Sequence, residues 1–194
     1  IRFILPANAY SAATMMCFAG DEIIIGPLST LGPIDPQFKG IPARAIIDGF
    51  EKVVEKLKDA KLLTAYLPLL QKYDLHTLEI CRSAENLSKE LASQWLSRYM
   101  FNSNDDEQKV KDIVDYFSSY DIQKSHSRPI VREVAKNLQL KILKTEDVGI
   151  GDLIKSLNNQ YDIWFDKLPF YKLFEDSRGT HWGRRFEIHL EKIR

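Results

Sequence analysis

The sequence lacks an excess of charge of either sign. Its 194 residues include 27 Lys and Arg and 27 Asp and Glu, so the formal net charge is zero. A protein that binds a polyanion through its phosphates usually carries a surplus of basic side chains. We therefore expect no nucleic-acid partner.

Cysteine is also scarce, and neither cysteine nor histidine follows a metal-binding spacing. Cys17 and Cys81 lie far apart, and the four histidines form no HxxxH or CxxC set. These patterns argue against a structural zinc and against a disulfide framework. We expect no metal and no cofactor, and the low cysteine content is typical of a reducing compartment such as the cytoplasm.

Glycine and proline are too few for a collagen-like or low-complexity chain. There are nine Gly and eight Pro, while 44% of the residues are hydrophobic and 28% are charged. A chain of this length and composition is neither fibrous nor disordered, and it is long enough to bury a core of its own.

No long apolar run is continuous either. Residues Phe3–Gly20 carry no charge, which raises the question of a signal peptide or a membrane span. The run is interrupted near its middle by Pro6, Asn8, Tyr10 and Ser11. We instead predict a buried strand over 1–5, a turn over 6–10 and a buried helix over 11–19.

The following segments alternate between strand and helix patterns. A second strand is predicted over Asp21–Ile25, and a helix from Pro42 through Ala60 repeats its apolar residues at helical spacing. Helices separated by polar turns are predicted over 62–120. Strands that alternate with helices in this way indicate an α/β domain with a largely buried sheet.

The C-terminal part continues this pattern. The stretch HSRPIVREVAKNLQLKIL, which begins at His126, predicts a turn, a short helix and a strand, and a last helix begins at Asp152 and runs to about Trp164. We place the α/β domain at residues 1–165 and a C-terminal extension or closing strand at 166–194.

Ser11 lies where a strand-to-helix turn enters a helix, and two interpretations compete for it. In one, its hydroxyl caps the helix, as serines at helix starts commonly do. In the other, Ser11 is a nucleophile, and the Ala12 amide stabilises the oxyanion of a tetrahedral intermediate. The small side chains of Ala12 and Ala13 would let a substrate backbone approach closely.

A resemblance favours the nucleophile. The segment NAYSAATMMCFAGDEIIIGPLSTLGPIDPQ resembles the nucleophile segment of the serine dehydrogenase proteinase family, a Clp-fold serine peptidase group related to signal peptide peptidases. That family has a serine in a small-residue turn, a helix, an Asp-Glu-Ile strand and a Ser-x-Leu-Gly-Pro-Ile-Asp-Pro-Gln stretch, which is Ser29–Gln37 here. The His126 segment resembles the last helix and strand of Clp-type and crotonase-type domains.

The resemblance implies a Clp/crotonase-like fold with a helical middle region. It also implies a serine peptidase that acts on peptides or proteins. The sequence departs from the family pattern in three places. Ala13 replaces a usual glycine, and Gln139 replaces the glycine of a Gly-Leu pair, which questions a left-handed corner there. The upstream βαβ half, whose glycine-rich turn supplies the other oxyanion amide, is not seen. We therefore expect the chain to lack the N-terminal half of the domain.

The general base is the least defined part of the predicted site. Clp peptidases place a histidine where this chain has Asp35, which argues against a histidine-based triad, whereas signal peptide peptidases use a lysine. Lys52 is the first candidate base, His126 the second and Asp35 the third, with Asp35 better suited to orienting a base. Lys39 lies in a loop and is expected to face solvent. An arginine such as Arg44 stays protonated and cannot act as a base.

Two other functions remain open. A catalytically inactive Clp-fold scaffold or peptide-binding protein would explain the missing lysine or histidine pattern, and a crotonase-type enzyme would act on acyl thioesters without a serine nucleophile. The resemblance also implies a homo-oligomer, for which the central helices with Trp95, Tyr99 and Phe101 and the C-terminal tail are the expected contacts. Membrane association would depend on an absent upstream segment.

Overall fold

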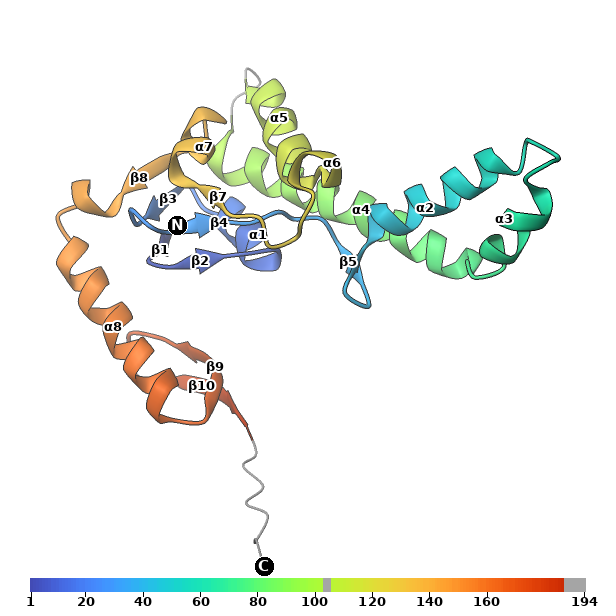
Figure 1. Ribbon diagram of the computed structural model, residues 1–194. Coiled ribbons are helices and arrows are strands. Elements are labelled where there is room, and N and C mark those ends of the chain that lie inside the picture. The colour runs from blue at the N-terminus through green and yellow to red at the C-terminus, as the bar shows by residue number, and fades with distance from the viewer. Residues whose placement is uncertain (103–105, 187–194) are drawn as a thin grey trace, which may run out of the picture. The chain divides into compact units, whose positions relative to one another are not determined.

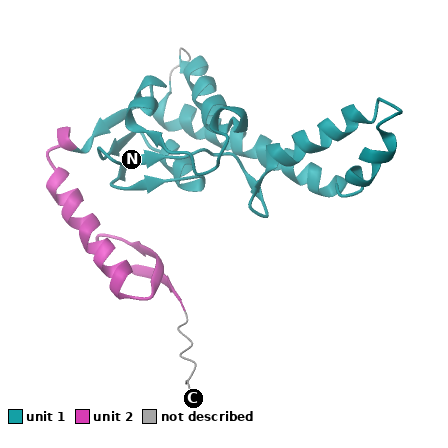
Figure 2. Cartoon of the chain, viewed as in Figure 1, with its two compact units in different colours: residues 1–145 teal, residues 146–194 magenta. Residues whose placement is uncertain are grey.

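The chain forms two compact units in a computed structural model that describes residues 1–102 and 106–186. The first unit comprises residues 1–145 and the second residues 146–194 (Figure 2). The sequence predicted that the α/β domain ends at residue 165. The division between the two compact units lies earlier in the chain, after Thr145.

A parallel sheet lies at the centre of the first unit. Its strands are β1 (Arg2–Leu5), β3 (Glu22–Ile25) and β8 (Ile142–Lys144), in the order β1-β3-β8. In the described chain β3 is the middle strand, and its three isoleucines are buried, which is typical of a parallel strand covered on both faces. The predicted strands at 1–5 and 21–25 are thereby confirmed, but the first is not buried as predicted, because Leu5 is the one buried residue of β1.

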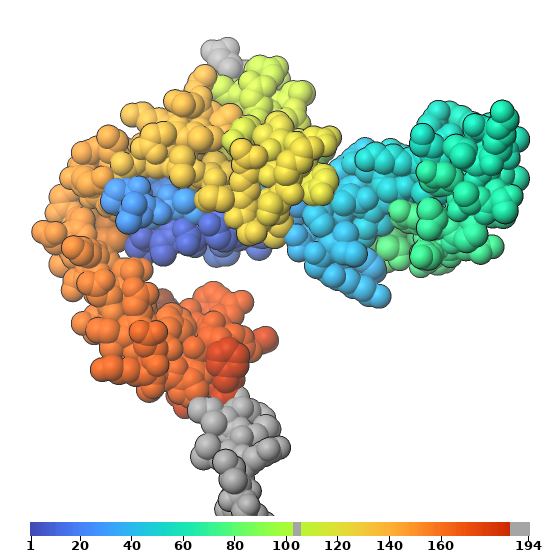
Figure 3. Space-filling model, viewed as in Figure 1, coloured from blue at the N-terminus to red at the C-terminus, as the bar shows by residue number. Residues whose placement is uncertain are grey.

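A second small sheet joins the start of the chain to a distant segment. It consists of β2 (Asn8–Ala9), β4 (Thr30–Leu31) and β7 (Ile130–Val131). Strands β2 and β4 are parallel, and β7 runs antiparallel to β4 with Leu31 opposite Ile130. In Figure 3 the segment around β7 accordingly lies against the N-terminal strands.

Helices cover these sheets and extend beyond them. Their bounds are α1 (Ala12–Phe18), α2 (Ala43–Lys56), α3 (Leu63–Leu70), α4 (Leu75–Trp95), α5 (Glu107–Ser118), α6 (Tyr120–Gln123) and α7 (Arg132–Asn137), with a π-helical turn, η1 (Leu96–Met100), continuing α4. A hairpin of β5 (Gln37–Phe38) and β6 (Ile41–Pro42) leads into α2. Helices α2, α3 and the first part of α4 project from the sheets as an arm (Figure 1).

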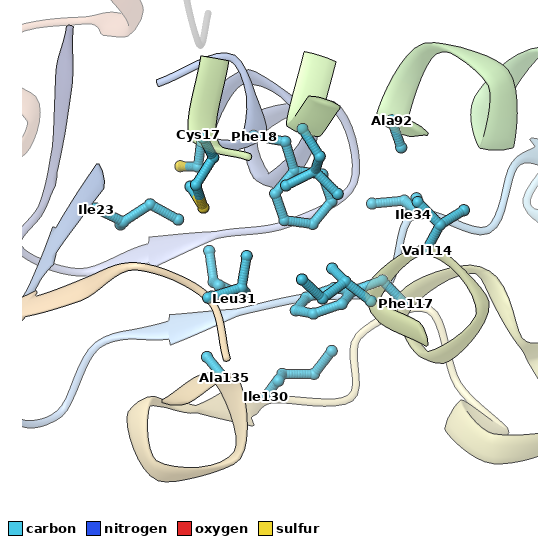
Figure 4. Packing of buried hydrophobic residues seen from close by; sticks show 14 of the residues in the cluster. Cys17, Phe18, Ile23, Leu31, Ile34, Ala92, Val114, Phe117, Ile130 and Ala135 are labelled. Carbon is cyan, nitrogen blue, oxygen red and sulfur yellow. The ribbon is translucent and has the colours of Figure 1, made fainter. Parts of the chain in front are cut away.

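The core of the first unit lies between the sheets and helices α1, α4 and α5. Figure 4 shows Phe18 of α1 and Phe117 of α5 within this cluster, and their rings meet edge to face with centroids 5.2 Å apart. Leu31 and Ile130 pack into the same cluster from the second sheet. Phe101, which we expected at an oligomer contact, is buried because it packs within this core cluster.

The second unit is a helix with a hairpin. A short 3-10 turn (Thr145–Asp147) leads to α8 (Gly151–Lys167), and β9 (Phe170–Glu175) pairs antiparallel with β10 (His181–Arg185). The predicted closing strand therefore has a partner in its own unit. The rest of the predicted extension, residues 187–194, lies outside the described part of the chain.

The mixed α/β class is confirmed, and so are the strand and the helix predicted at the start of the chain, whereas the turn predicted over 6–10 contains strand β2. The corner at Gln139 also forms without its glycine. Gln139 adopts a left-handed conformation with φ 64°, and the Leu140 N–H donates to the Ala135 carbonyl across the end of α7. Among the described helices, none has the length and apolarity to cross a bilayer.

Candidate active site around Ser11

The backbone at Ser11 is strained. Ser11 has φ 54° and ψ −120°, a combination that residues with a Cβ rarely adopt, and it directly precedes the first residue of α1. Its side chain makes no capping hydrogen bond and is half-buried. The helix-cap interpretation is therefore wrong for this conformation, and a strained strand-to-helix turn is the arrangement that exposes a nucleophilic serine.

The buried hydroxyl of Thr14 holds this turn in place. Its single proton is shared between the Ala9 and Gly32 carbonyls, at 2.7 and 2.9 Å, and its oxygen accepts the Gly32 N–H at 3.1 Å. The Ser11 N–H donates to the Pro33 carbonyl at 3.1 Å. The turn, the start of α1 and the segment after β4 are thus fixed to one another.

Gly32 packs closely against the Tyr10 ring in this turn, which leaves no room for a side chain. A Cβ on Gly32 would lie 2.0 Å from Cδ1 of Tyr10, so the Tyr10 ring rests directly on this backbone. The Tyr10 hydroxyl in turn hydrogen-bonds the Thr30 hydroxyl at 2.9 Å, and Thr30 donates to the Asn8 side chain at 2.8 Å. The glycine in Ser-x-Leu-Gly-Pro is therefore explained by the fit of Tyr10 against the turn.

The first backbone amide of α1, that of Ala12, is available to a ligand. Ala12 and Ala13 are exposed, and the Ala13 N–H is used by the Tyr10 carbonyl. The Ala12 N–H has no acceptor within the part of the chain that the structure describes. An N–H group beside the nucleophile, free of a helical partner, can stabilise a developing oxyanion.

A histidine–carboxylate pair lies near this turn. His126 Nδ1 is 2.9 Å from Asp35 Oδ1, although the two residues are 91 positions apart. Asp35 is 3% exposed, and its Oδ2 is buried without a hydrogen-bond partner in the described structure. His126 keeps a quarter of its side chain exposed. A buried carboxylate on one ring nitrogen fixes the imidazole and leaves the other nitrogen free to exchange a proton.

The segment Pro33–Asp35 carries both parts of the site. Pro33 receives the Ser11 N–H, and Asp35, two residues later, holds His126. Two extended residues span at most about 7 Å. Ile34 between them is anchored on both sides, because its N–H donates to the Phe117 carbonyl at 2.9 Å and its carbonyl accepts the Ser88 hydroxyl at 2.8 Å.

The loop that carries His126 has its own support. It follows a left-handed Lys124 at the end of α6, and the Arg128 guanidinium donates to the Ile122 carbonyl at 2.8 Å, which closes the loop. Strand β7 then returns the chain to the sheet. The loop thus brings His126, the second candidate base, to the Asp35 carboxylate from far along the chain.

The lysine candidates lie elsewhere. Lys52 is exposed on α2, and no described hydrogen bond or ion pair joins it to Ser11. The hydrogen bond and charge of Lys124 lower the pKa of Asp121, to which the charge of Lys52 adds a smaller contribution. Lys39 is exposed at the tip of the β5–β6 hairpin, as expected. Arg44 pairs with the carboxylates of Asp48, Glu51 and Glu85.

Sequence reasoning named Ser11, Ala12, Asp35 and His126, and missed the residues that position them. Thr14 and Ser88 read as ordinary helix residues, and nothing in their spacing indicates that their hydroxyls bond to distant backbone. The threonine three residues after the serine in NAYSAAT was the one available signal.

Comparison with known proteins gives this geometry a context. Two uncharacterized proteins of Methanocaldococcus jannaschii are similar, MJ1495 with 35% identity over 60 residues and MJ0137 with 28% identity over 164 residues. These matches cover 31% and 82% of this chain, and 20% and 48% of the respective relatives. The chain thus spans half or less of the length of these relatives. No solved structure matches it. The model of one protein family matches residues 1–160, and the chain belongs to that family, the ClpP-like SDH-type serine proteinases.

Proposed function

We propose that this protein hydrolyses peptide bonds through an acyl-enzyme on Ser11, with His126 as the general base and Asp35 as the residue that orients it. The observation that carries the proposal is the buried Asp35 carboxylate on His126 Nδ1, on the same short segment that binds the Ser11 backbone. Membership of a serine proteinase family supports a hydrolase.

The roles follow from the hydrogen bonds. An ionised Asp35 accepts the Nδ1–H proton of His126, so the free Nε2 lone pair can take the proton of the Ser11 hydroxyl as the oxygen attacks a carbonyl. The imidazolium that forms is stabilised by the buried carboxylate. It then gives the proton to the leaving amine, and water hydrolyses the acyl-enzyme by the same route.

The oxyanion would be held by the Ala12 N–H and by a second donor. Strand β1 is an edge strand in the described chain, with β3 on one side only. We propose that the other donor belongs to a strand-to-helix turn beside β1, in an N-terminal half of the domain that precedes residue 1. An edge strand offers the backbone groups that such a pairing needs.

We also propose that the protein self-associates through the arm. No residue of α3 is buried, and Leu63, Leu67 and Leu69 are 40–46% exposed. Trp95 and Tyr99, expected at the contact, are half-buried nearer the base of the arm. Exposed apolar side chains on successive turns are typical of a surface that another chain covers.

The catalytic proposal is tested by labelling and hydrolysis with the full-length protein. A fluorophosphonate should label wild type at Ser11, as identified by mass spectrometry, and a mixed peptide library should be cleaved. Ser11→Ala should abolish both, and His126→Gln should lower kcat/KM by about 1,000-fold or more. Asp35→Asn should lower it by at least about 100-fold, because the carboxylate that holds the imidazole is lost.

Two control variants make the test specific. His76→Gln removes an exposed histidine of α4 and should leave kcat/KM unchanged. Lys52→Gln should also leave it unchanged, whereas loss of activity with Lys52→Gln and retention with His126→Gln would make lysine the base. Absence of both labelling and cleavage in wild type would favour the scaffold instead.

A further inference from the structure

The β9–β10 hairpin of the second unit has two different faces. Its strands pair antiparallel, so alternate residues along each strand lie on opposite sides. On one side, Leu173 and Glu175 line a small cavity together with residues of α8, and the Tyr161 hydroxyl donates to the Glu175 carboxylate at 3.1 Å. Helix α8 therefore covers this side. Within the described part of the second unit, no element covers the other side.

The uncovered side carries two aromatic and two basic residues in register. Phe174 lies directly opposite Trp182, and Lys172 lies directly opposite Arg184. We call these four residues the aromatic-basic face. Phe174 and Trp182 are each 51% exposed, and their ring centroids are 5.5 Å apart. Two large rings exposed side by side are typical of a surface that another molecule covers.

The exposed aromatic surface continues at the open end of the hairpin and stops at its turn. Tyr171 and Phe186 are 48% and 63% exposed, and their ring centroids are 4.8 Å apart. The turn is polar, because the Asp176 carboxylate accepts the N–H groups of Arg178 and Thr180. The aromatic rings thus lie along the strands, where they offer a broad contact surface.

The charges on the aromatic-basic face have one sign. Neither Lys172 nor Arg184 forms an ion pair among the described residues, and the two described carboxylates of the hairpin, Glu175 and Asp176, are bound by Tyr161 and Arg178 instead. Like charges directly opposite each other on neighbouring strands repel. An anionic group between the two cations would remove this repulsion, so charge complementarity indicates an anionic partner.

The two cations lie at the level of the rings. Lys172 Nζ is 5.3 Å from the centroid of the Phe174 ring, and Arg184 Cζ is 5.5 Å from that of Trp182. Basic side chains that lie along exposed aromatic rings are typical of the interface between a membrane and water. There the rings are buried at the depth of the lipid headgroups, and the cations contact the phosphates.

The charge of the whole second unit argues against a nucleic acid as the anionic partner. Residues 146–194 contain eight Lys and Arg and nine Asp and Glu, so their net charge is −1. A polynucleotide gains affinity from each phosphate that a basic side chain neutralises, and this unit has no basic excess for it. A bilayer meets only one face of a protein and also gains from burial of the rings.

We propose that the aromatic-basic face binds the surface of a bilayer that contains anionic lipids. Lys172 and Arg184 contact lipid phosphates, and the rings of Phe174 and Trp182 are buried among the headgroups. This binding is peripheral and needs no upstream segment, on which the sequence made membrane association depend. It is also independent of the proposed peptidase chemistry, because it concerns where the protein acts.

The first test measures sedimentation of the full chain with vesicles of phosphatidylcholine alone or mixed with an equal amount of phosphatidylglycerol. Wild type should bind the anionic vesicles at least about tenfold more tightly, because each basic side chain contributes a factor of about five at an anionic surface. The double variant Lys172→Gln, Arg184→Gln should lose this preference. The matched control Lys155→Gln, Lys167→Gln removes the same charge from exposed positions of α8 and should keep it.

The second test places Trp182 at the membrane. With Trp95→Phe and Trp164→Phe, Trp182 is the one remaining tryptophan. Its emission should shift to shorter wavelength with anionic vesicles and be quenched by lipids with brominated acyl chains. Unchanged Trp182 emission in protein that sediments with the vesicles would overturn the proposal.

Three other results would also overturn it. These are absence of vesicle binding, equal binding to both vesicle types, and retention of the preference by Lys172→Gln, Arg184→Gln. A labelled single-stranded oligonucleotide provides the comparison with nucleic acid, and binding of it that requires both cations, without vesicle binding, would assign the face to nucleic acid. Ser11→Ala should bind vesicles as wild type does, so the outcome is separate from that of the peptidase tests.

Discussion

The strained backbone at Ser11 leads to a prediction about stability. In Ser11→Gly the residue at φ 54° and ψ −120° loses its Cβ, and glycine adopts such conformations without steric cost. Because strain of this kind costs about 1–3 kcal/mol, its release raises the free energy of unfolding by up to that amount. The greater freedom of glycine in the unfolded chain takes back about 0.5–1 kcal/mol.

The net stabilisation expected for Ser11→Gly is about 0.5–2 kcal/mol. No described hydrogen bond of the Ser11 side chain is lost, so only the greater freedom of glycine in the unfolded chain opposes the gain. For a chain of this length, 1 kcal/mol shifts Tm by about 2–4 °C. Urea unfolding followed by tryptophan fluorescence measures the free energy, and a thermal scan measures Tm.

Ser11→Ala is the matched control, because alanine keeps the Cβ and therefore the strain. It should change the free energy of unfolding by less than about 0.5 kcal/mol. Both variants should lose peptidase activity, so only their stabilities should differ. A Ser11→Gly protein no more stable than Ser11→Ala would refute the claim that the turn is strained.

Three further predictions concern residues around the site. Thr14→Val should lower the free energy of unfolding by about 1–3 kcal/mol in urea titrations, because the Gly32 N–H loses its acceptor and the Ala9 and Gly32 carbonyls lose the proton they share, whereas Thr64→Val on the exposed face of α3 should have little effect. Gln139→Gly should raise it by about 1 kcal/mol by relaxing the left-handed corner, with kcat/KM unchanged, and a decrease would contradict the strain inferred from φ 64°. Burial raises the pKa of the Cys17 thiol from 9.0 to about 11. The thiol therefore ionises in the unfolded chain at a lower pH than in the folded protein. Its contribution to the free energy of unfolding should be fully present below about pH 9 and should fall as the pH rises from 9 toward 11. Unfolding curves of Cys17→Ala should lack that part of the alkaline decrease, and an identical pH dependence in both proteins would show that Cys17 is not the cause.

The elements set by local pattern could be predicted from the sequence. The breakers between Pro6 and Ser11 divide an uncharged run into strand and helix, and the run of isoleucines in β3 indicates a strand buried on both faces. Both signals act over a few residues, where backbone preference and burial agree. Ser11 itself could be placed at the helix start, although its positive φ could not, because serine has no intrinsic preference for that conformation.

The parts that depend on distant contacts could not be predicted. Asp35 and His126 were named as separate candidates, and their pairing depends on how α2–α6 return the chain to β4. Lys52 was ranked first because signal peptide peptidases use a lysine base downstream of the serine, while its exposed position depends on which face of α2 packs against α4. The π-helical turn after α4 is likewise set by packing of Leu96 and Met100 rather than by local preference.

The separation of 91 residues between Asp35 and His126 also bears on how the protein is made. A nascent chain that has emerged only as far as α6 already contains the serine and the carboxylate, but its histidine is still within the ribosome. Even after His126 emerges, the loop is secured only when β7 pairs with β4, through Leu31 and Ile130. Closing so long a segment is slow compared with forming local helices. With His126 as the proposed base, incomplete chains would lack it and would not cleave peptides during synthesis.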